Sequence, residues 1–206
     1  MNSSQLTGSI FLDLKKAFDV IPLDLILEKM YFYGIQNSEL AWFRMYLTHR
    51  QQCVSIQGTS SNFLEVKSGV PQGSILGPLI FSLYINDIGN LPFHSNTKIS
   101  LYADDTAIFN TDNNLSNIQC NLQADFDLIK NWLLINRMYL HPQKTKAMIF
   151  GSKRKLNKRS MLIKFNDTTL ENVDNIKYLG VILDSQLSWS FHISHISGKI
   201  SRSISC

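Results

Sequence analysis

Apolar residues recur along this chain with two spacings, one typical of strands and the other typical of helices. A short apolar run over 9–14 predicts a buried strand close to the first residue. Two further runs, 99–103 and 106–109, are rich in β-formers and flank the adjacent carboxylates Asp104 and Asp105. These two runs therefore predict a pair of strands joined by an acidic turn.

Helical spacing appears in several segments, and the longest of them carries apolar residues on one face. Pro22 lies in the first turn of the earliest helix and Gly34 ends it, as is typical of helix boundaries. The predicted helices are 21–34, 37–47, the residues after Gly73, 115–138 and 189–204. The remaining predicted strands are 145–150, a pair formed by 161–165 and 176–183, and a hairpin of 53–56 and 63–66 around a loop at 58–62.

Strands interleaved with helices, some of them paired as hairpins, indicate an α+β fold in which helices pack on a largely antiparallel sheet. The chain has 206 residues, 44% of them hydrophobic, which is enough for one sizeable core. A net charge of +4 and an isoelectric point of about 8.9 permit a polyanionic partner without requiring one. The three cysteines are scattered, which argues against a disulfide framework and against a thiolate metal site.

No segment is long and apolar enough to predict a membrane span, and the first residues are too polar for a signal peptide. The run 78–85 is apolar but short, and Asn86 and Asp87 interrupt it. We therefore expect a soluble intracellular protein, located in the cytoplasm and the nucleus.

The acidic turn at Asp104 and Asp105 requires nearby positive charge, because two adjacent anions repel each other. A divalent cation with oxygen ligands, such as Mg²⁺, supplies that charge, whereas an ordinary Asp-Asp hairpin turn is the alternative. Asp13 follows the first predicted strand and would complete a site for two Mg²⁺ ions if that strand lies beside the hairpin. The alternative for Asp13 is to cap the next helix, although Asp19 is the better candidate for that cap.

The segment 68–81 is rich in glycine and proline and precedes a predicted helix. Glycine lets the backbone approach a ligand closely, and Gln72 places an amide at the entrance to the helix. A structural loop explains the same composition, so the segment by itself is weak evidence for a binding site.

Taken together, these segments resemble the reverse transcriptase domain of LINE-type, non-LTR retrotransposons. The resemblance extends from about residue 10 to the C-terminus and rests on five motifs in the expected order. The motifs are Asp13 with Phe18-Asp19, the Gly-Val-Pro-Gln-Gly-Ser segment from Gly69 that continues to Tyr84-Ile85-Asn86-Asp87, Tyr-Ala-Asp-Asp at 102–105, Leu-His-Pro-Gln-Lys-Thr-Lys at 140–146, and Tyr-Leu-Gly-Val at 178–181.

This resemblance implies an RNA-directed DNA polymerase that adds deoxynucleotides to a primer 3′-hydroxyl. Asp13, Asp104 and Asp105 would be the catalytic carboxylates and would hold two Mg²⁺ ions, with Mn²⁺ as a substitute. Phe18 would crowd a 2′-hydroxyl and so favour deoxynucleotides, and Gln72 would contact the incoming nucleotide or the template. The implied partners are an RNA template, a DNA primer and deoxynucleoside triphosphates.

Later motifs imply contacts with the leaving group and the primer. Lys144 would donate a proton to the pyrophosphate leaving group or stabilise its charge, with Lys146 as a rival. The hairpin that grips the primer end would consist of Tyr178, Leu179 and Gly180.

A basic segment, residues 153–159, lies between the fourth and fifth motifs and is predicted to form a loop. Its cations would contact nucleic-acid phosphates, although a solvated hairpin tip explains them as well. They are Lys153, Arg154, Lys155, Lys158 and Arg159.

Further along, His192 and His195 have no nearby cysteine or carboxylate in the sequence, and we interpret them as surface residues.

The resemblance divides the chain into a polymerase palm, residues 1–184, and the start of a thumb-like helical segment, residues 185–206. Only twelve residues precede Asp13, so the fingers would be largely missing and the thumb truncated. Two alternatives stay open: a reverse transcriptase of the group II intron type, and a catalytically silent remnant that binds nucleic acid.

Overall fold

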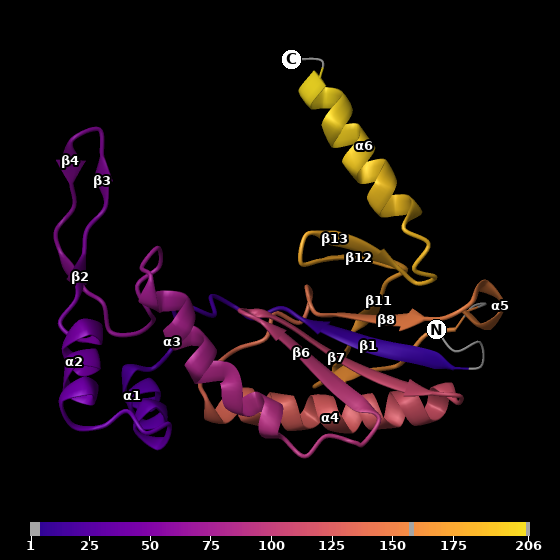
Figure 1. The fold of residues 1–206 in the computed structure, drawn as a ribbon, viewed down its shortest axis with the longest axis horizontal. Coiled ribbons are helices and arrows are strands. Elements are labelled where there is room, and N and C mark those ends of the chain that lie inside the picture. Colours follow the sequence, from indigo (N-terminus) through magenta and orange to yellow (C-terminus); the bar gives the residue numbers. More distant parts are fainter. Residues whose placement is uncertain (1–4, 157–158, 205–206) are drawn as a thin grey trace. The chain divides into compact units, whose positions relative to one another are not determined.

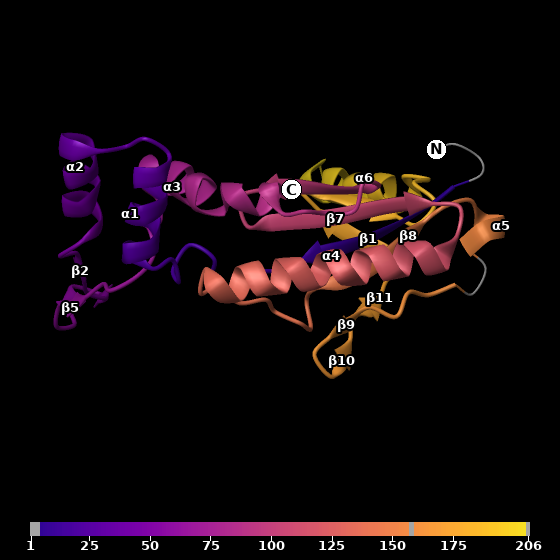
Figure 2. The same cartoon turned by 90° about the horizontal axis from the view of Figure 1, so that it is seen from below.

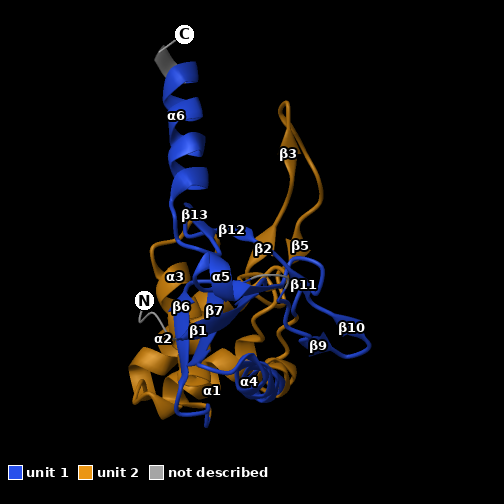
Figure 3. Ribbon diagram, turned by 90° about the vertical axis from the view of Figure 1, so that its right-hand side faces the viewer, with its two compact units in different colours: residues 1–13, 92–128, 140–206 blue, residues 14–91, 129–139 orange. Residues whose placement is uncertain are grey.

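The structure, a computed structural model, describes residues 5–156 and 159–204. It divides into two compact units, which Figure 3 colours separately. The first unit takes residues 1–13, 92–128 and 140–206, and the second takes 14–91 and 129–139. Each unit is therefore built from segments that lie far apart in the sequence.

A five-stranded sheet with the order β11-β8-β1-β7-β6 forms the centre of the first unit (Figure 1). Three of its strand pairs, β1–β7, β1–β8 and β6–β7, are antiparallel, and only β11 runs parallel to its neighbour β8. The strands are β1 (Leu6–Leu12), β6 (Thr97–Tyr102), β7 (Asp105–Asp112), β8 (Lys146–Phe150) and β11 (Glu171–Asn172). The expectation of an α+β fold with a largely antiparallel sheet is confirmed.

Helix α4 (Leu115–Ile135) covers one face of this sheet with its first turns, as Figure 2 shows. Its buried residues recur every three or four positions, as the apolar pattern of the sequence predicts. The helix lies close to β1 because Gly8 has no side chain. A Cβ atom there would overlap Ile118 and would lie 2.9 Å from Leu122 Cδ1.

The opposite face of the sheet is covered by a hairpin of β12 (Asn175–Tyr178) and β13 (Val181–Asp184). Phe11 contributes to the buried cluster on this face, and its ring centroid lies 5.2 Å from that of Tyr178 in an edge-on contact. The buried members of the cluster are Phe11, Ala107, Met148 and Phe150. The sheet is therefore packed on both faces, which explains why β1 is buried along nearly its whole length.

Asp184 joins the hairpin to the last helix, α6 (Ser190–Ile204). Its side chain is buried and accepts hydrogen bonds from three backbone amides, those of Gln186, Ser188 and Trp189, and from the Ser188 hydroxyl. Burial by itself raises the pKa of Asp184, but these hydrogen bonds together outweigh burial and hold the pKa below its ordinary value. The ionised carboxylate thereby fixes the turn from which α6 begins.

The second unit contains three helices, a short 3₁₀ segment and the last turns of α4. The helices are α1 (Leu23–Phe32), α2 (Asn37–Leu47) and α3 (Leu76–Ile85), and the 3₁₀ segment η1 covers Asn86–Asn90. All three begin near the positions that the sequence predicts. Gly34 has a φ of +90°, which glycine adopts readily, and it ends α1 as expected.

A partly buried lysine stabilises the packing of this unit. Lys29 donates hydrogen bonds to the Tyr84 carbonyl (2.7 Å) and to Asp87 (2.8 Å), and its ammonium group lies 4.5 Å from the Tyr84 ring centroid and 4.7 Å from that of Trp132. Burial lowers the pKa of Lys29, while Asp87 opposes that shift. The aromatic faces and the carboxylate together offset the cost of removing this cation from water.

The structure corrects the predicted hairpin in the second unit. Instead of one hairpin around a loop at 58–62, there are two short ladders in line: β2 (Gln51–Gln52) with β5 (Leu64–Glu65), and β3 (Ser55–Ile56) with β4 (Thr59–Ser60). The chain reverses at Gln57 and Gly58, both with positive φ, because a two-residue turn of this kind matches the twist of paired strands.

Two predictions in the first unit are also wrong. Residues 161–165 and 176–183 do not pair with each other, since 176–183 spans both strands of the β12–β13 hairpin. The other segment pairs locally through β9 (Lys164–Phe165) and β10 (Thr168–Thr169). The basic segment starts with a single helical turn, α5 (Lys153–Leu156), where we expected a loop.

Within the described ranges, none of the helices has both the length and the apolar character that crossing a membrane would require.

The close approach of α4 to β1 generates a stability prediction. We expect Gly8→Ala to lower the free energy of unfolding by about 1–3 kcal/mol, because an added methyl group overpacks the helix–sheet contact. Gly89→Ala is the matched control, since a Cβ there meets no atom within 4 Å. Urea denaturation of both variants measures the effect, and equal stabilities would contradict this description of the contact.

Candidate active site

The ends of two neighbouring strands bring three carboxylates to one edge of the sheet. In the β6–β7 hairpin Tyr102 pairs with Asp105, which leaves Ala103 and Asp104 as the connecting turn. The antiparallel pairing of β1 with β7 ends at Leu12 opposite Thr106, so Asp13 follows directly beside Asp105. The predicted position of Asp13 beside the acidic hairpin is confirmed.

The pleat of the sheet also places Asp13 and Asp105 on the same face. Side chains alternate along a strand, so Asp13 shares a face with Phe11, and Asp105 shares one with Ala107. Phe11 and Ala107 both belong to the cluster under the β12–β13 hairpin. The carboxylates therefore face the side of the sheet on which that hairpin lies.

The loop after α4 holds Asp13 through its backbone. The Asp13 amide donates to Thr145 Oγ1 (3.3 Å), and the Asp13 carbonyl accepts from the His141 amide (2.8 Å). The fourth sequence motif thus contacts the first, and the carboxylate is held by backbone that cannot shift without breaking these bonds.

The carboxylates influence one another electrostatically. Partial burial raises the pKa of Asp105, and the negative charges of Asp104 and Asp13 raise it further. Among the described residues, the cation within ion-pair distance of these carboxylates is Lys144, whose Nζ lies 4.0 Å from Asp13 Oδ1, with both side chains substantially exposed. Such a contact is weak, so the edge keeps an excess of negative charge.

The donor set suits a hard divalent cation, since it consists of carboxylate oxygens with uncompensated charge. Across the residues that the structure describes, however, no three His, Cys, Asp or Glu side chains are already gathered closely enough to hold a metal ion. Asp13 and Asp105 share an edge and a face, and Asp104 lies in the adjoining turn, but the three side chains are not in a closed ligand geometry.

The turn that carries Asp104 has a strained backbone. Ala103 has a φ of +51°, in the left-handed region that costs a residue with a side chain about 1 kcal/mol or more. Strain of this kind persists where the surrounding structure imposes it, and here the β6–β7 pairing does so on both sides of the turn.

The structure distinguishes the two candidate lysines of the fourth motif. Lys146 is held by an ion pair with Glu171 and a hydrogen bond to the Gln143 carbonyl. Lys144, by contrast, has a side chain that is 63% exposed, and its ammonium group lies 4.0 Å from Asp13 Oδ1. Of the two, Lys144 is therefore the one placed at the acidic edge.

The residues expected to grip a primer form the tip of the β12–β13 hairpin. Tyr178 packs on Phe11, and its hydroxyl lies 3.4 Å from Ser100 Oγ on β6. Leu179 and Gly180 are the two turn residues, with φ values of +48° and +80°. Both positions need positive φ in this turn type, so a leucine stands where asparagine or aspartate is usual.

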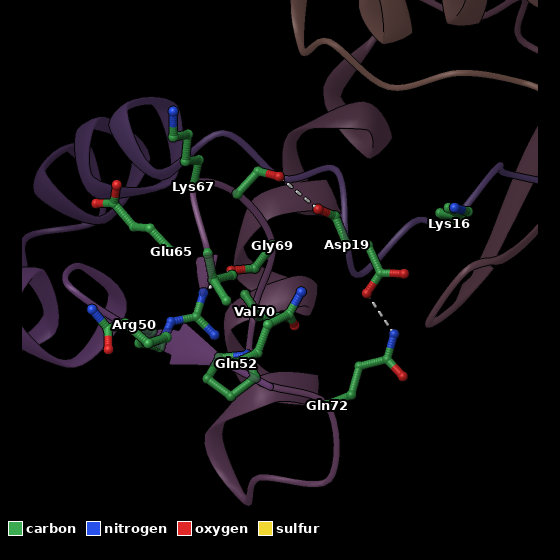
Figure 4. Close-up of a pocket in the computed structure, with 13 residues that line it drawn as sticks. Lys16, Asp19, Arg50, Gln52, Glu65, Lys67, Gly69, Val70 and Gln72 are labelled. Atoms are coloured by element: carbon green, nitrogen blue, oxygen red, sulfur yellow. Dashed lines mark hydrogen bonds between the residues drawn. The ribbon is translucent and has the colours of Figure 1, made fainter. Parts of the chain in front are cut away.

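Phe18 and Gln72 belong to the second unit. The Phe18 ring stacks on Phe81, with 4.3 Å between centroids and 24° between planes. Gln72 is exposed, and its Nε2 donates to Asp19 Oδ1 at 2.6 Å (Figure 4). The predicted capping role of Asp19 is wrong, because α1 begins after Pro22 without a side-chain cap.

Gly69 brings the second motif against the first. Its φ is +82°, and a Cβ there would lie 2.7 Å from the Asp19 carbonyl and 2.8 Å from that of Phe18. The Gly69 amide donates to Ile21, and the Val70 amide donates to Phe18. Only glycine permits this contact, which in turn places Gln72 next to Asp19.

A cavity of about 900 Å³ opens beside this contact (Figure 4). Its lining is mostly polar and includes Lys16, Asp19, Arg50 and Gln72. Sequence reasoning missed Arg50, which donates to the Leu47 carbonyl (2.9 Å) and the Gly69 carbonyl (2.5 Å). Burial lowers the pKa of Arg50. No sequence signal identified it, because its contact with Gly69 depends on tertiary structure.

The basic segment is only partly described. Lys153, Arg154 and Lys155 lie in α5, and Arg159 is exposed, whereas Lys158 lies outside the described residues.

The two histidines of α6 are not simply surface residues, since His192 Nδ1 accepts from the Ile182 amide (3.3 Å). His195 Nε2 is enclosed without a hydrogen-bond partner among the described atoms.

Comparisons with known proteins extend over most of the chain. Residues 1–183 match the family described as reverse transcriptase (RNA-dependent DNA polymerase). The RNA-directed DNA polymerase from mobile element jockey of Drosophila melanogaster is 26% identical over 204 residues, which are 95% of this chain and 22% of that relative. Its counterpart from Drosophila funebris is 26% identical over 202 residues, 95% of this chain and 22% of the relative. The chain thus spans about a fifth of the length of these curated relatives.

Solved telomerase structures have a similar fold. Apo telomerase from Candida tropicalis superposes with a TM-score of 0.60 at 13% identity, covering 90% of this chain and 35% of that one. Telomerase from Candida albicans, in complex with a fragment of telomeric RNA, gives 0.58 at 13% identity, covering 88% and 30%. At this level of identity the similarity concerns the fold alone.

The raised pKa of Asp105 generates a prediction about stability. The folded state retains the Asp105 proton to a higher pH than the unfolded chain, whose aspartates titrate near a pKa of about 3.9. The resulting stabilisation is complete below that value and is lost as the pH rises through the raised pKa. We therefore expect the free energy of unfolding of Asp105→Asn to increase relative to that of the parent as the pH rises from acidic to neutral. The increase should be less than about 1 kcal/mol, because solvent screens the charge.

Chemical denaturation at several pH values measures this difference. Asp167→Asn is the control, since it removes the same charge from the exposed turn between β9 and β10. A gain that does not change with pH, or an equal gain in the control, would contradict the electrostatic coupling.

Proposed function

The chain belongs to the reverse transcriptase family, and we propose that it supplies the catalytic centre of an RNA-directed DNA polymerase of a non-LTR retrotransposon. Its reaction is transfer of a deoxynucleotide to a primer 3′-hydroxyl. The 3′-oxygen forms a bond to the α-phosphorus, the bond to the β-phosphate breaks, and pyrophosphate leaves. The observation that carries this proposal is the convergence of Asp13, Asp104 and Asp105 at one sheet edge.

Asp13 and Asp104 are the main ligands for two Mg²⁺ ions in this proposal, and Asp105 completes the carboxylate cluster. Partial burial is the largest cause of the raised pKa of Asp105, and the negative charges of Asp104 and Asp13 add to it. That added negative charge supports the assignment, because a divalent cation would neutralise it. Bound Mg²⁺, or Mn²⁺ in its place, lowers the pKa of the attacking hydroxyl and stabilises charge on the leaving group. The chain's own contribution is to hold the carboxylates through the β1–β7 pairing and the contacts of Asp13 with 141–145.

Three residues act on the incoming deoxynucleoside triphosphate in this proposal. Phe18 excludes the 2′-hydroxyl, and its stacking on Phe81 supports a rigid ring suited to that role. Gln72 contacts the nucleotide through its amide, which Asp19 orients. Lys144 protonates or stabilises the departing pyrophosphate, and its position 4.0 Å from Asp13 supports this assignment over Lys146.

The primer and template contacts are proposed from the resemblance and from the surface of the first unit. Tyr178, Leu179 and Gly180 grip the primer end, since their hairpin packs on the face toward which Asp13 and Asp105 point. We assign residues 1–184 to a polymerase palm and 185–206 to the start of a thumb. The cations of 153–159 contact nucleic-acid phosphates, with affinity that falls as salt rises.

Primer extension tests the activity directly. With a poly(rA) template, an oligo(dT) primer and Mg²⁺, we expect the chain to incorporate dTMP, and we expect Asp104→Asn to reduce incorporation by about a hundredfold or more because it removes a ligand carboxylate. Asp167→Asn should retain parent activity. Binding of the template–primer without incorporation, in a chain whose fold is intact by circular dichroism, would instead support a silent nucleic-acid-binding remnant.

The role of Phe18 generates a second test. We expect Phe18→Ala to increase incorporation of ribonucleotides relative to deoxynucleotides by about tenfold or more, because the ring no longer occupies the space of a 2′-hydroxyl. Phe81→Leu serves as the control, since it disturbs the aromatic stack while leaving the Phe18 ring. Competition between dTTP and UTP in one reaction measures the ratio, and an unchanged ratio in Phe18→Ala would refute the assignment.

A further inference from the structure

A second cavity of about 420 Å³ lies in the same unit as Phe18 and Gln72 but includes neither of them. Its walls come from the segment before α1, from residues 67–68, and from the residues that follow α4. The volume falls within the range of small-ligand sites. Lys67 and Ser68 also line the larger cavity, so the two sites share one segment of chain.

Arg137 and Tyr139, which follow α4, line this cavity, and hydrogen bonds fix the backbone on which they stand. The Tyr84 hydroxyl is buried and donates to the Asn136 carbonyl at 2.5 Å. Met138 is buried two residues later, and its amide donates to the Leu133 carbonyl at 2.8 Å. Arg137 and Tyr139 flank Met138 and both line the cavity.

The backbone conformation at Arg137 is unfavourable for any residue that has a side chain. Its φ is +51°, at the residue that ends the helix, where glycine or asparagine is usual. An arginine there costs about 1 kcal/mol relative to glycine, and this cost suggests that the guanidinium has a use. Its ion pair with Asp24 is long at 3.5 Å and largely exposed, so most of its donors remain available to a ligand.

The chemistry of the lining is that of a nucleotide site. Tyr139 is 58% exposed and offers a ring face on which a base can stack. Val20 and Pro22 add apolar surface. Arg137 and Lys67 supply two cations for a phosphate group, with the Ser68 hydroxyl as a further donor. Asp24 also lines the cavity, and its carboxylate is paired with Arg137.

We propose that this cavity binds a nucleoside 5′-phosphate, with the base against Tyr139 and the phosphate held by Arg137 and Lys67. The ligand is either a free nucleotide or one nucleotide of a single strand, since both present the same groups. The proposal does not depend on polymerase activity, because none of the carboxylates Asp13, Asp104 and Asp105 lines the cavity.

Binding of dAMP to the 206-residue chain, measured by saturation-transfer NMR and calorimetry with EDTA present, tests this site apart from any metal-dependent binding. The tetranucleotide (dA)₄ is the strand probe, and pyrophosphate is the probe without a base. Arg137→Gly is the key variant, since glycine suits the backbone there and the variant should unfold at an equal or higher urea concentration. Tyr139→Ala removes the stacking ring, and Arg44→Gln removes one positive charge elsewhere in the unit as a matched control.

We expect Arg137→Gly and Tyr139→Ala each to weaken dAMP binding by about tenfold, with Arg44→Gln unchanged. If (dA)₄ binds at least tenfold more tightly than dAMP and is equally sensitive to both variants, the natural ligand is a strand; the reverse order identifies a free nucleotide. Binding of dAMP that survives Arg137→Gly, or pyrophosphate binding as tight as that of dAMP and indifferent to Tyr139→Ala, would overturn the proposal.

Discussion

The antiparallel pairing of β1 with β7 is the constraint on which the rest of this structure depends. It joins a strand from the start of the chain to a hairpin beyond residue 100, and it fixes the register so that Leu12 lies opposite Thr106. A shift by one residue would turn Phe11 away from the cluster it fills and move Asp13 to the opposite face. The same apolar contacts that stabilise the sheet therefore determine where the carboxylates lie.

In this arrangement the packing of apolar side chains and the repulsion between carboxylates act in opposite directions. Burial of Phe11, Ala107 and Met148 favours the register, whereas the negative charges gathered at the strand ends repel one another. This repulsion adds to the rise that partial burial causes in the pKa of Asp105. Each exposed carboxylate costs little by itself, because water screens the repulsion. The fold can thus tolerate an excess of negative charge at this edge, and a divalent cation would turn that excess into binding energy.

Local patterns in the sequence were sufficient to predict the helices and the acidic hairpin. Helices α1, α2 and α4 begin at or close to the predicted residues, because apolar periodicity and the residues Pro22 and Gly34 mark them. The division of the predicted hairpin into two ladders, β2–β5 and β3–β4, was not predicted. Their strands are two residues long and exposed, so they have no apolar alternation. The predicted pairing of 161–165 with 176–183 was wrong for another reason: β12 and β13 pair with each other across Leu179 and Gly180, the hairpin that the fifth motif already implied.

The candidate site was likewise only partly predictable from the sequence. The juxtaposition of Asp13 with Asp104 and Asp105 was expected on the condition that the first strand lies beside the acidic hairpin, which the β1–β7 pairing fulfils. The bond from Gln72 to Asp19 and the contacts of Arg50 and Arg137 depend on tertiary packing. A titration of Mn²⁺, followed by the loss of its free electron paramagnetic resonance signal, tests the central claim that β1 completes the acidic edge. We expect the parent chain and Asp167→Asn to bind Mn²⁺ equally, and Asp13→Asn to bind it about tenfold more weakly or worse. Binding by Asp13→Asn as tight as that of the parent would contradict the account.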